Sequence, residues 1–314
     1  MELVNEIVEA RNFWEAWMFV RRNKGAAGID KMSVDVLDVY MPLHMDEIKQ
    51  SICRKQYKPS PVRRVFIPKP NGKQRPLGIP TVVDRVVQQA TAQVLNRIYE
   101  PLFSEHSYGF RPNRSCHQAI NQALDYLNAG YEWVVDFDIE KYFDTVNHDK
   151  LISILREQVN DSATLHLIRS FLKSGVMEGG FVSATTEGVP QGGCISPILS
   201  NIYLDKLDKE LESRELRFVR YADDFDIFVK SERSADRVMA SVSRWLESKL
   251  RLKVSATKTK VVRPTKSVFL GFTFWKSTRG WECRPTDAAK KKLETKVKQV
   301  LVRKRATAQP MSYI

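Results

Sequence analysis

Two adjacent acidic residues, Asp223 and Asp224, follow Tyr221 and Ala222 between two short apolar runs that read as strands. A tight turn between strands would place both carboxylates at the tip of a hairpin. With a third acid from a separate strand, they would form a site for hard cations such as magnesium. Such a site supports two-metal phosphoryl transfer, in which the ions bind the attacking and leaving oxygens. Taken alone, the tetrapeptide is equally consistent with an ordinary acidic turn, because aspartate favours turns.

The apolar segment 133–139 offers the third carboxylate, because it contains Asp136 and Asp138. Side chains alternate between the two faces of a strand, so these acids lie on the same face. Carboxylates within an apolar strand are costly unless they bind a metal, form ion pairs or contact water. The alternative is that both acids lie on a solvated sheet face, and the strand pattern alone leaves it open.

The composition predicts a globular protein that binds a polyanion. The chain has 314 residues, which favours two lobes over a single core. Lys and Arg number 50 against 37 Asp and Glu, and the formal charge of +13 makes nucleic acid the first candidate partner. No apolar run reaches the ~18 residues of a membrane span, and the acidic N-terminus does not resemble a signal peptide. The four cysteines and five histidines are scattered, so we expect reduced thiols, no zinc site and no catalytic histidine.

The predicted helices and strands follow no regular βαβ order, which indicates an α+β fold. Residues 1–55 are expected to be helical around a loop at 25–28. Two extended runs, 62–68 and 75–79, flank Asn71 and Gly72, a strong signal for a hairpin. Further helices are expected at 84–98, 148–172, 235–250 and 287–305, and one more helix is expected to follow a loop at 185–194. Further strands are expected at 131–139, near 261 and at 269–274.

A series of short motifs gives the sequence a family resemblance. In chain order they are PLGIP at 76–80, YGFRP at 108–112, DIEKYFD at 138–144, GVPQGG at 188–193, YADD at 221–224 and LGF at 270–272. Their order and spacing resemble those of reverse transcriptases, and most nearly the group II intron-encoded reverse transcriptase/maturase. The resemblance runs from about Gly25 to Phe274.

The resemblance implies a right-hand polymerase with fingers and palm and a helical N-terminal extension. The implied segments are the extension and fingers at 1–84, the first part of the palm with its connecting helix at 85–149, the second part of the fingers at 150–187, the second part of the palm at 188–286 and the basic start of a thumb at 287–314. The chain ends where the thumb of that family would begin, so we expect the thumb to be absent.

The resemblance also implies a metal site. By their positions in the motifs, Asp138, Asp223 and Asp224 would hold two magnesium ions, which manganese could replace. The backbone carbonyl of Ile139 would be a further ligand. We choose Asp138 over Asp136 because the family motif has an aromatic residue five positions after the metal ligand, where Phe143 stands.

Two residues of these motifs, Phe143 and Gln191, would act on the nucleotide and its surroundings, and a third, Asp144, would have a structural role. Phe143 would be the steric gate that excludes a 2′-hydroxyl, the group that distinguishes ribonucleotides, although plain core packing is the alternative. Gln191 would approach the nascent base pair. For Asp144 we prefer the interpretation that it caps the following helix.

Basic residues would act on the phosphates. By resemblance to the fingertips of the family, Lys69 and Arg75 would grip the incoming triphosphate, although a solvated basic hairpin is the alternative. Lys258 matches the lysine that would protonate the leaving pyrophosphate, and Lys260 is the alternative for that role.

The leading hypothesis is an RNA-directed DNA polymerase of a group II intron, acting in the bacterial cytoplasm. Its partners would be dNTPs, a DNA primer, an RNA template and intron RNA, whose splicing and mobility it would assist. No membrane partner is expected, and a homodimer is compatible with the resemblance. One alternative is an RNA-binding splicing cofactor without significant polymerase activity, which would have no need of all three metal-binding acids. Another is a retron, diversity-generating or phage-defence reverse transcriptase, against which the N-terminal region and the motif at 108–112 argue.

Overall fold

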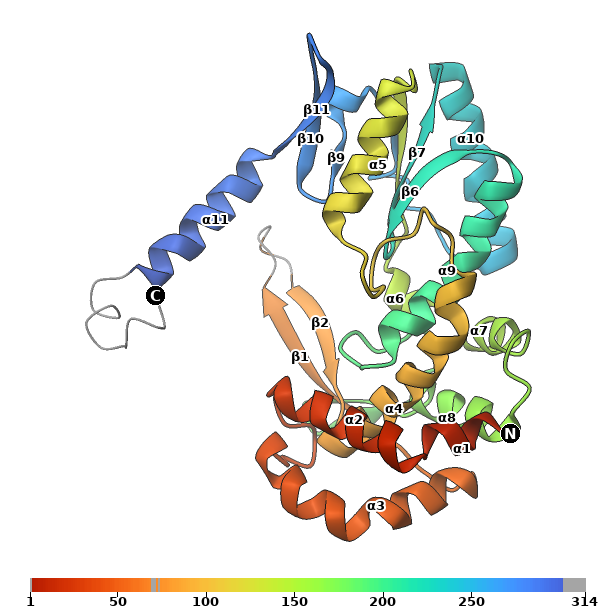
Figure 1. The fold of residues 1–314 in the computed structure, drawn as a ribbon, viewed down its shortest axis with the longest axis vertical. Helices are drawn as coiled ribbons and strands as arrows, with labels where there is room; N and C mark the ends of the chain where they lie inside the picture. The colour runs from red at the N-terminus through yellow and green to blue at the C-terminus, as the bar shows by residue number, and fades with distance from the viewer. Residues whose placement is uncertain (1, 69–71, 73, 302–314) are drawn as a thin grey trace.

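The computed structural model describes residues 2–68, 72 and 74–301, and it has the expected α+β architecture. Figure 1 shows one part built mainly of helices, at the bottom, and a second part built of sheets covered by helices, at the top. The helical N-terminal extension is confirmed as α1 (Leu3–Ile7), α2 (Ala10–Arg22) and α3 (Leu37–Cys53). No helix in these ranges has both the length and the hydropathy needed to cross a bilayer.

A four-stranded antiparallel sheet with the order β6-β7-β3-β8 forms the centre of the upper part, the palm. Its strands are β3 (Trp133–Asp138), β6 (Arg217–Tyr221), β7 (Asp224–Val229) and β8 (Lys260–Val262). Val135 and Phe137 pack in a core with α9 (Ser196–Ser213) and α10 (Glu232–Trp245). Val134 packs on the opposite face, in a core with α5 (Cys116–Asn128). Since both faces are covered, polar side chains of this sheet reach solvent mainly at the strand ends.

The helix α4 (Val82–Tyr99) connects the two parts of the molecule. It begins at Val82 because the Thr81 side chain caps it, accepting a hydrogen bond from the backbone N–H of Asp84. Val87 and Ala90 pack with the N-terminal helices, whereas Leu95 packs in the palm core. One buried helix therefore contributes to both cores and fixes the fingers relative to the palm.

The second sheet belongs to the fingers and has the order β2-β1-β4-β5. β1 (Val62–Pro68) and β2 (Gln74–Ile79) form the predicted hairpin, which rises toward the palm in Figure 1. β4 (Val176–Glu178) and β5 (Phe181–Ser183) were not predicted, because three-residue strands with mostly exposed side chains carry no readable periodicity.

The C-terminal part forms a third sheet, of β9 (Val268–Phe269), β10 (Phe272–Ser277) and β11 (Gly280–Pro285). Leu270 and Gly271 turn between β9 and β10 with φ of 50° and 81°, the signs that a type I′ hairpin turn requires. The basic helix α11 (Asp287–Val300) follows and projects away from the palm in Figure 1. The remainder of the predicted helix, beyond residue 301, lies outside the described residues.

Two local predictions are wrong. The helix expected over 148–172 is divided into α7 (His148–Leu155) and α8 (Ser162–Leu172), and Asp161 caps the second by accepting from the N–H of Ala163 at 2.9 Å. Asp144 caps no helix: it lies inside the short helix α6 (Tyr142–Thr145), and Asn147 caps α7 by accepting from the N–H of Lys150 at 2.9 Å. The remaining helical turns are Val34–Val36, Glu100–Leu102, Leu246–Leu250 (a π turn that continues α10) and Pro264–Lys266.

Candidate active site

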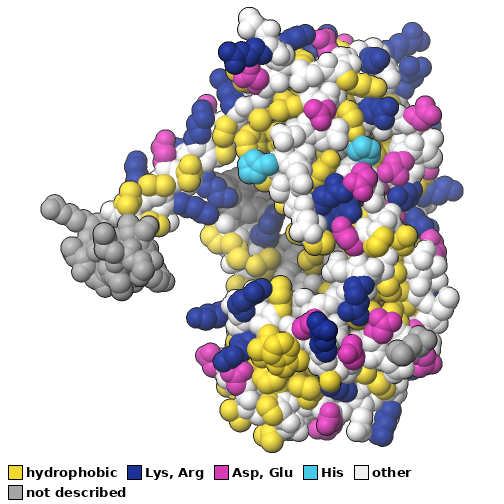
Figure 2. All heavy atoms as spheres, in the orientation of Figure 1, with side chains coloured by type: hydrophobic (Ala, Val, Ile, Leu, Met, Phe, Trp, Pro, Cys, Tyr) yellow, Lys and Arg dark blue, Asp and Glu magenta, His cyan; other side chains and the backbone are white. Residues whose placement is uncertain are grey.

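A cavity of about 680 Å³ lies between the fingers hairpin and the end of the palm sheet. Figure 2 shows the molecule hollowed between its two parts, with Lys and Arg side chains spread over both. The cavity brings together eight of the nine predicted site residues, namely Arg75, Asp138, Ile139, Phe143, Gln191, Asp223, Asp224 and Lys258. The ninth, Lys69, lies outside the described residues. The other residues that line it are Gln74, Pro76, Phe110, Lys141, Tyr142 and Asp144.

The three acidic residues meet where two strands of the palm end. Asp138, the last residue of β3, is directly opposite Asp224, the first residue of β7, and Asp223 precedes it in the turn. Burial raises the pKa of Asp224 to about 6, and the charges of Asp223 and Asp138 act in the same direction. The pKa of Asp223 is also raised, mainly by burial. Partly buried carboxylates that repel one another are the donor set that a divalent cation stabilises, so these residues fit a metal site.

The backbone next to Asp138 provides a further oxygen. The carbonyl of Asp138 accepts from the N–H of Ser255 at 2.8 Å, and the N–H of Glu140 donates to the carbonyl of Lys253 at 2.8 Å. Between them, the carbonyl of Ile139 accepts no backbone hydrogen bond in the described part of the chain. It is therefore available as a ligand at the wall of the cavity.

Lys258 faces the metal-binding acids directly. Its Nζ donates to both carboxylate oxygens of Asp138, at 3.0 and 2.8 Å. In the described part of the chain no three Asp, Glu, His or Cys side chains are already arranged as metal ligands, and at this site Asp138 is instead paired with Lys258. A cation bound here would therefore share Asp138 with this ammonium group or displace it. Lys260, the alternative to Lys258, does not line the cavity and pairs with Asp136 at 3.3 Å.

Asp136 belongs to a second acidic pair deeper in the sheet. It is directly opposite Asp226, whose side chain is buried and lies 3.4 Å from the hydroxyl of Ser267. Burial raises the pKa of Asp226 well above its ordinary range, and the charge of Asp136 adds to the effect. Asp136 does not line the cavity, which favours Asp138 as the metal ligand.

A buried ion pair supports the hairpin that carries Asp223. Arg220 is fully buried at the end of β6 and donates to both oxygens of Asp208 on α9, at 2.7 and 2.5 Å. It also donates to the carbonyl of Ala222 at 2.9 Å. From the other side, Gly109 packs so closely that an added Cβ would lie 2.2 Å from the N of Ala222. The turn is therefore contacted closely on two sides, by Arg220 and by the backbone of Gly109.

Phe143 and Gln191 line the cavity beside the acids. Phe143 is half-buried, packs against the palm core and meets the ring of Tyr142 edge-on at 5.1 Å. The loop with Gln191 is joined to the fingers, because the N–H of Gly78 donates to the carbonyl of Gln191 at 2.8 Å. Arg75 lies opposite Ile67 in the hairpin and points its charge at the same cavity.

Phe110 is a cavity residue to which the sequence interpretation gave no role. Its side chain is 48% exposed and its backbone has φ of 59°, which is a strained conformation for a bulky residue. The next residue, Arg111, is buried and donates to the carboxylate of Glu100 and to the carbonyls of Ser104 and Ser107. The sequence did contain a signal for this residue. The phenylalanine of YGFRP is apolar but fits neither the helical nor the strand spacing of apolar residues, so a role outside the core could have been considered.

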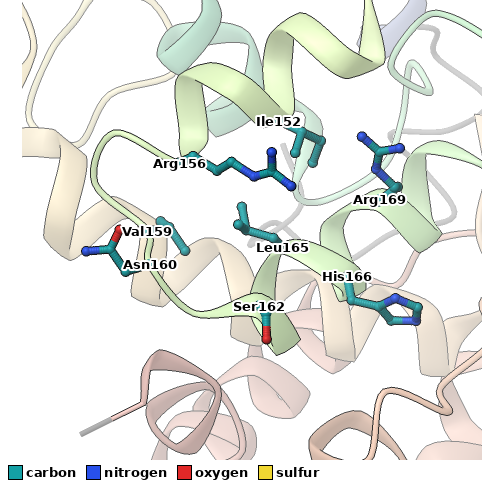
Figure 3. A pocket seen from close by; sticks show the side chains of 8 residues that line it. All are labelled: Ile152, Arg156, Val159, Asn160, Ser162, Leu165, His166 and Arg169. Atoms are coloured by element: carbon teal, nitrogen blue, oxygen red, sulfur yellow. The ribbon is translucent and has the colours of Figure 1, made fainter.

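A second hollow, of about 430 Å³, lies between α7 and α8 and shares no lining residue with the cavity. Figure 3 shows Arg156 and Arg169 on the two sides of the apolar side chains of Ile152 and Leu165. None of the described residues that line it is acidic, so it offers no carboxylate for a cation. Of these two hollows, the cavity between fingers and palm is therefore the one whose lining includes the carboxylates expected from the sequence.

Comparison with known proteins identifies the family. Residues 67–274 match the model of the reverse transcriptase (RNA-dependent DNA polymerase) family. Protein YkfC of Escherichia coli K12 is 34% identical over 298 residues, which cover 82% of this chain and 78% of YkfC. The group II intron-encoded protein LtrA of Lactococcus lactis subsp. cremoris is 39% identical over 209 residues, 66% of this chain but only 35% of LtrA. The resemblance to group II intron-encoded proteins is thereby confirmed.

A solved structure agrees on the fold alone. Telomerase from Candida albicans matches with a TM-score of 0.59 at 14% identity, over 81% of this chain and 50% of that chain. The family uses divalent metal ions, in agreement with the acidic cavity. The chain belongs to the reverse transcriptase family of RNA-dependent DNA polymerases.

Proposed function

We propose that the cavity transfers a nucleotide from a dNTP to the 3′-hydroxyl of a DNA primer on an RNA template, with two magnesium ions. The observation that carries the proposal is the position of Asp138 opposite Asp224, with Asp223 beside them, in a cavity shared with Phe143 and Arg75. When bound, the two ions would favour the ionised primer hydroxyl and stabilise the leaving pyrophosphate.

The residues of the chain have separate tasks in this proposal. The carboxylates of Asp138, Asp223 and Asp224, with the carbonyl of Ile139, hold the ions. Arg75 neutralises the triphosphate with its fork of donors, and we assign Lys69 the same task. Gln191 orients the nascent base pair, and Lys258 donates a proton to pyrophosphate as it leaves.

Phe143→Ala is expected to reduce the preference for dNTPs over rNTPs by at least about tenfold, or ~1.4 kcal/mol. The reason is that a ring beneath the sugar leaves no space for a 2′-hydroxyl, whereas alanine leaves a gap. The measurement is single-nucleotide extension on an RNA template with dCTP or CTP, comparing kcat/KM. Phe181→Ala is the matched control, because Phe181 is 80% exposed on the fingers sheet. Unchanged selectivity in Phe143→Ala would remove the gate and leave Phe143 as a packing residue.

Lys258→Met is expected to tighten Mn²⁺ binding by up to about fivefold, because an exposed ion pair contributes up to ~1 kcal/mol. The same variant should extend primers more slowly at saturating metal, since the proton donor is lost. Free Mn²⁺ measured by electron paramagnetic resonance gives the affinity without any turnover. Lys260→Met is the control, because Lys260 pairs with Asp136 and not with Asp138. Equal Mn²⁺ affinity in both variants would show that Lys258 does not compete with the cation.

We further propose that the protein serves a group II intron and binds its RNA. The formal charge of +13 and the similarity to LtrA support this proposal. Bacterial relatives such as YkfC suggest the bacterial cytoplasm as the place of action. A homodimer stays a prediction that sedimentation would test. A role in RNA binding alone is disfavoured, because it gives no function to Asp138 facing Asp224.

A further inference from the structure

The loop that carries Gln191 is bound directly to the segment that carries Phe143. The N–H of Val189 donates to the carbonyl of Phe143 at 2.6 Å, and the N–H of Gly188 donates to the carbonyl of Val146 at 2.8 Å. Because Gln191 is also bonded to the fingers, this loop links the proposed gate to the strand that presents Arg75.

The close approach of the loop depends on a glycine. Gly188 has φ of 89°, and an added Cβ would lie 3.0 Å from the carbonyl oxygens of both Phe143 and Asp144. The two backbones are therefore in contact with no side chain between them. Because no side chain separates the two backbones, a shift of the loop would move Phe143 directly.

The remaining polar group of Gly188, its carbonyl, is bound by His148. The His148 side chain is buried at the start of α7, and its Nε2 lies 2.7 Å from this carbonyl oxygen. A carbonyl can only accept, so Nε2 is assigned as the donor. Nδ1 has no partner in the described part of the chain, and burial lowers the pKa of His148, both of which favour the neutral ring.

We propose that His148 is a positioning residue for sugar selection: its Nε2–H holds Gly188, and through Gly188 it fixes Phe143 and Gln191 as one unit around the nucleotide. The inference rests on the proposed function. The physical reason is that steric exclusion of one hydroxyl needs the ring placed to within a fraction of an ångström. A histidine that only stabilised the fold would affect dNTPs and rNTPs equally.

The test compares His148→Leu with His148→Gln. Glutamine places an amide donor near the position of Nε2, whereas leucine fills similar space without a donor. His148→Leu is expected to lower the dCTP/CTP ratio of kcat/KM about five- to tenfold, and His148→Gln to stay within about twofold of wild type. If His148→Leu does not fold, His148→Asn takes its place, because its shorter amide keeps polarity but falls short of Gly188.

Asn147→Ala is the matched control, since it removes the cap of α7 and leaves the His148–Gly188 bond. It should destabilise the protein in urea and leave the sugar ratio unchanged. A proportional loss of both activities in His148→Leu would overturn the proposal, as would an equal fall of the ratio in Asn147→Ala.

Phe143→Ala in the same assay separates this inference from the proposed function. If Phe143→Ala lowers the ratio and His148→Leu does not, only the role of His148 is wrong. If neither Phe143→Ala nor His148→Leu changes the ratio, the gate itself is wrong, and the inference falls with it. Absence of extension by the wild-type chain overturns both.

Discussion

Asp223→Asn is expected to lower primer extension by about 10²–10³-fold or more, while RNA affinity stays within a few-fold of wild type. The substitution keeps the shape of the side chain and removes one of the three proposed metal ligands among the carboxylates that line the cavity. The charge that holds the cations falls, and transition-state stabilisation falls with it. The measurement is extension of a DNA primer on an RNA template under single-turnover conditions, with affinity measured by filter binding.

Asp236→Asn is the matched control, because Asp236 is an exposed acid on α10, outside the cavity. It should leave both extension and RNA affinity unchanged. The pair of measurements also separates the two functions considered for the chain. Extension by Asp223→Asn at the wild-type rate would contradict the metal assignment, whereas a parallel loss of RNA affinity would indicate unfolding or a role of the turn in RNA binding.

Asp208→Ala is expected to lower the free energy of unfolding by about 3–5 kcal/mol. Both side chains of the Asp208–Arg220 pair are 0% exposed, so the substitution leaves an uncompensated guanidinium in the palm core. The effect should also reach the proposed active site, because Arg220 donates to the carbonyl of Ala222 in the turn that carries Asp223. Urea unfolding followed by circular dichroism gives the change in stability.

Glu210→Ala gives the comparison on the same helix. Glu210 pairs with Arg214 at 2.5 Å, but these side chains are 28% and 29% exposed, so the loss should be at most ~1 kcal/mol. The double variant Asp208→Ala/Arg220→Met should recover part of the stability lost by Asp208→Ala alone, because no buried charge is left unpaired. A similar small loss for Asp208→Ala and Glu210→Ala would contradict the importance of burial here.

Local patterns were sufficient to predict the elements that carry the metal site. Period-two alternation correctly put Asp136 and Asp138 on one face of a strand, and the acids of the YADD turn correctly followed a strand end. The extended runs on either side of residues 71 and 72 correctly predicted the paired strands β1 and β2, and Asn71 itself lies outside the described residues. Each of these patterns depends on residues that are close together in the sequence, so it can be recognised before the fold is known.

The remaining features depend on contacts between distant residues. Lys258 and Asp138 are 120 positions apart, and the pairing of β8 with β3 together with the backbone bond from Ser255 to Asp138 brings them together. The break between α7 and α8 has a similar cause, because Asp161 also accepts from the N–H of Val4 at 2.7 Å. Helical periodicity continues across that break, which is why the two helices were predicted as one.

The choice between caps shows a different limit. Asp144 and Asn147 are both favoured at helix starts, and residue type alone does not separate them. Asn147 caps α7 because the chain first forms the short helix α6, and Asp144 lies inside α6. The residues 142–148 then present Phe143 to the cavity and His148 to Gly188 from one continuous segment.

Locating the metal in the protein itself tests whether the cavity between fingers and palm is the active site. Fe²⁺ substituted for Mg²⁺ and treated with ascorbate and peroxide cleaves the backbone next to the bound ion. Cuts are expected near Ile139 and near Asp224, and they should be suppressed by excess Mg²⁺ and weakened by Asp223→Asn. Cleavage confined to other segments, such as the hollow between α7 and α8, would contradict the assignment of the fingers–palm cavity as the active site.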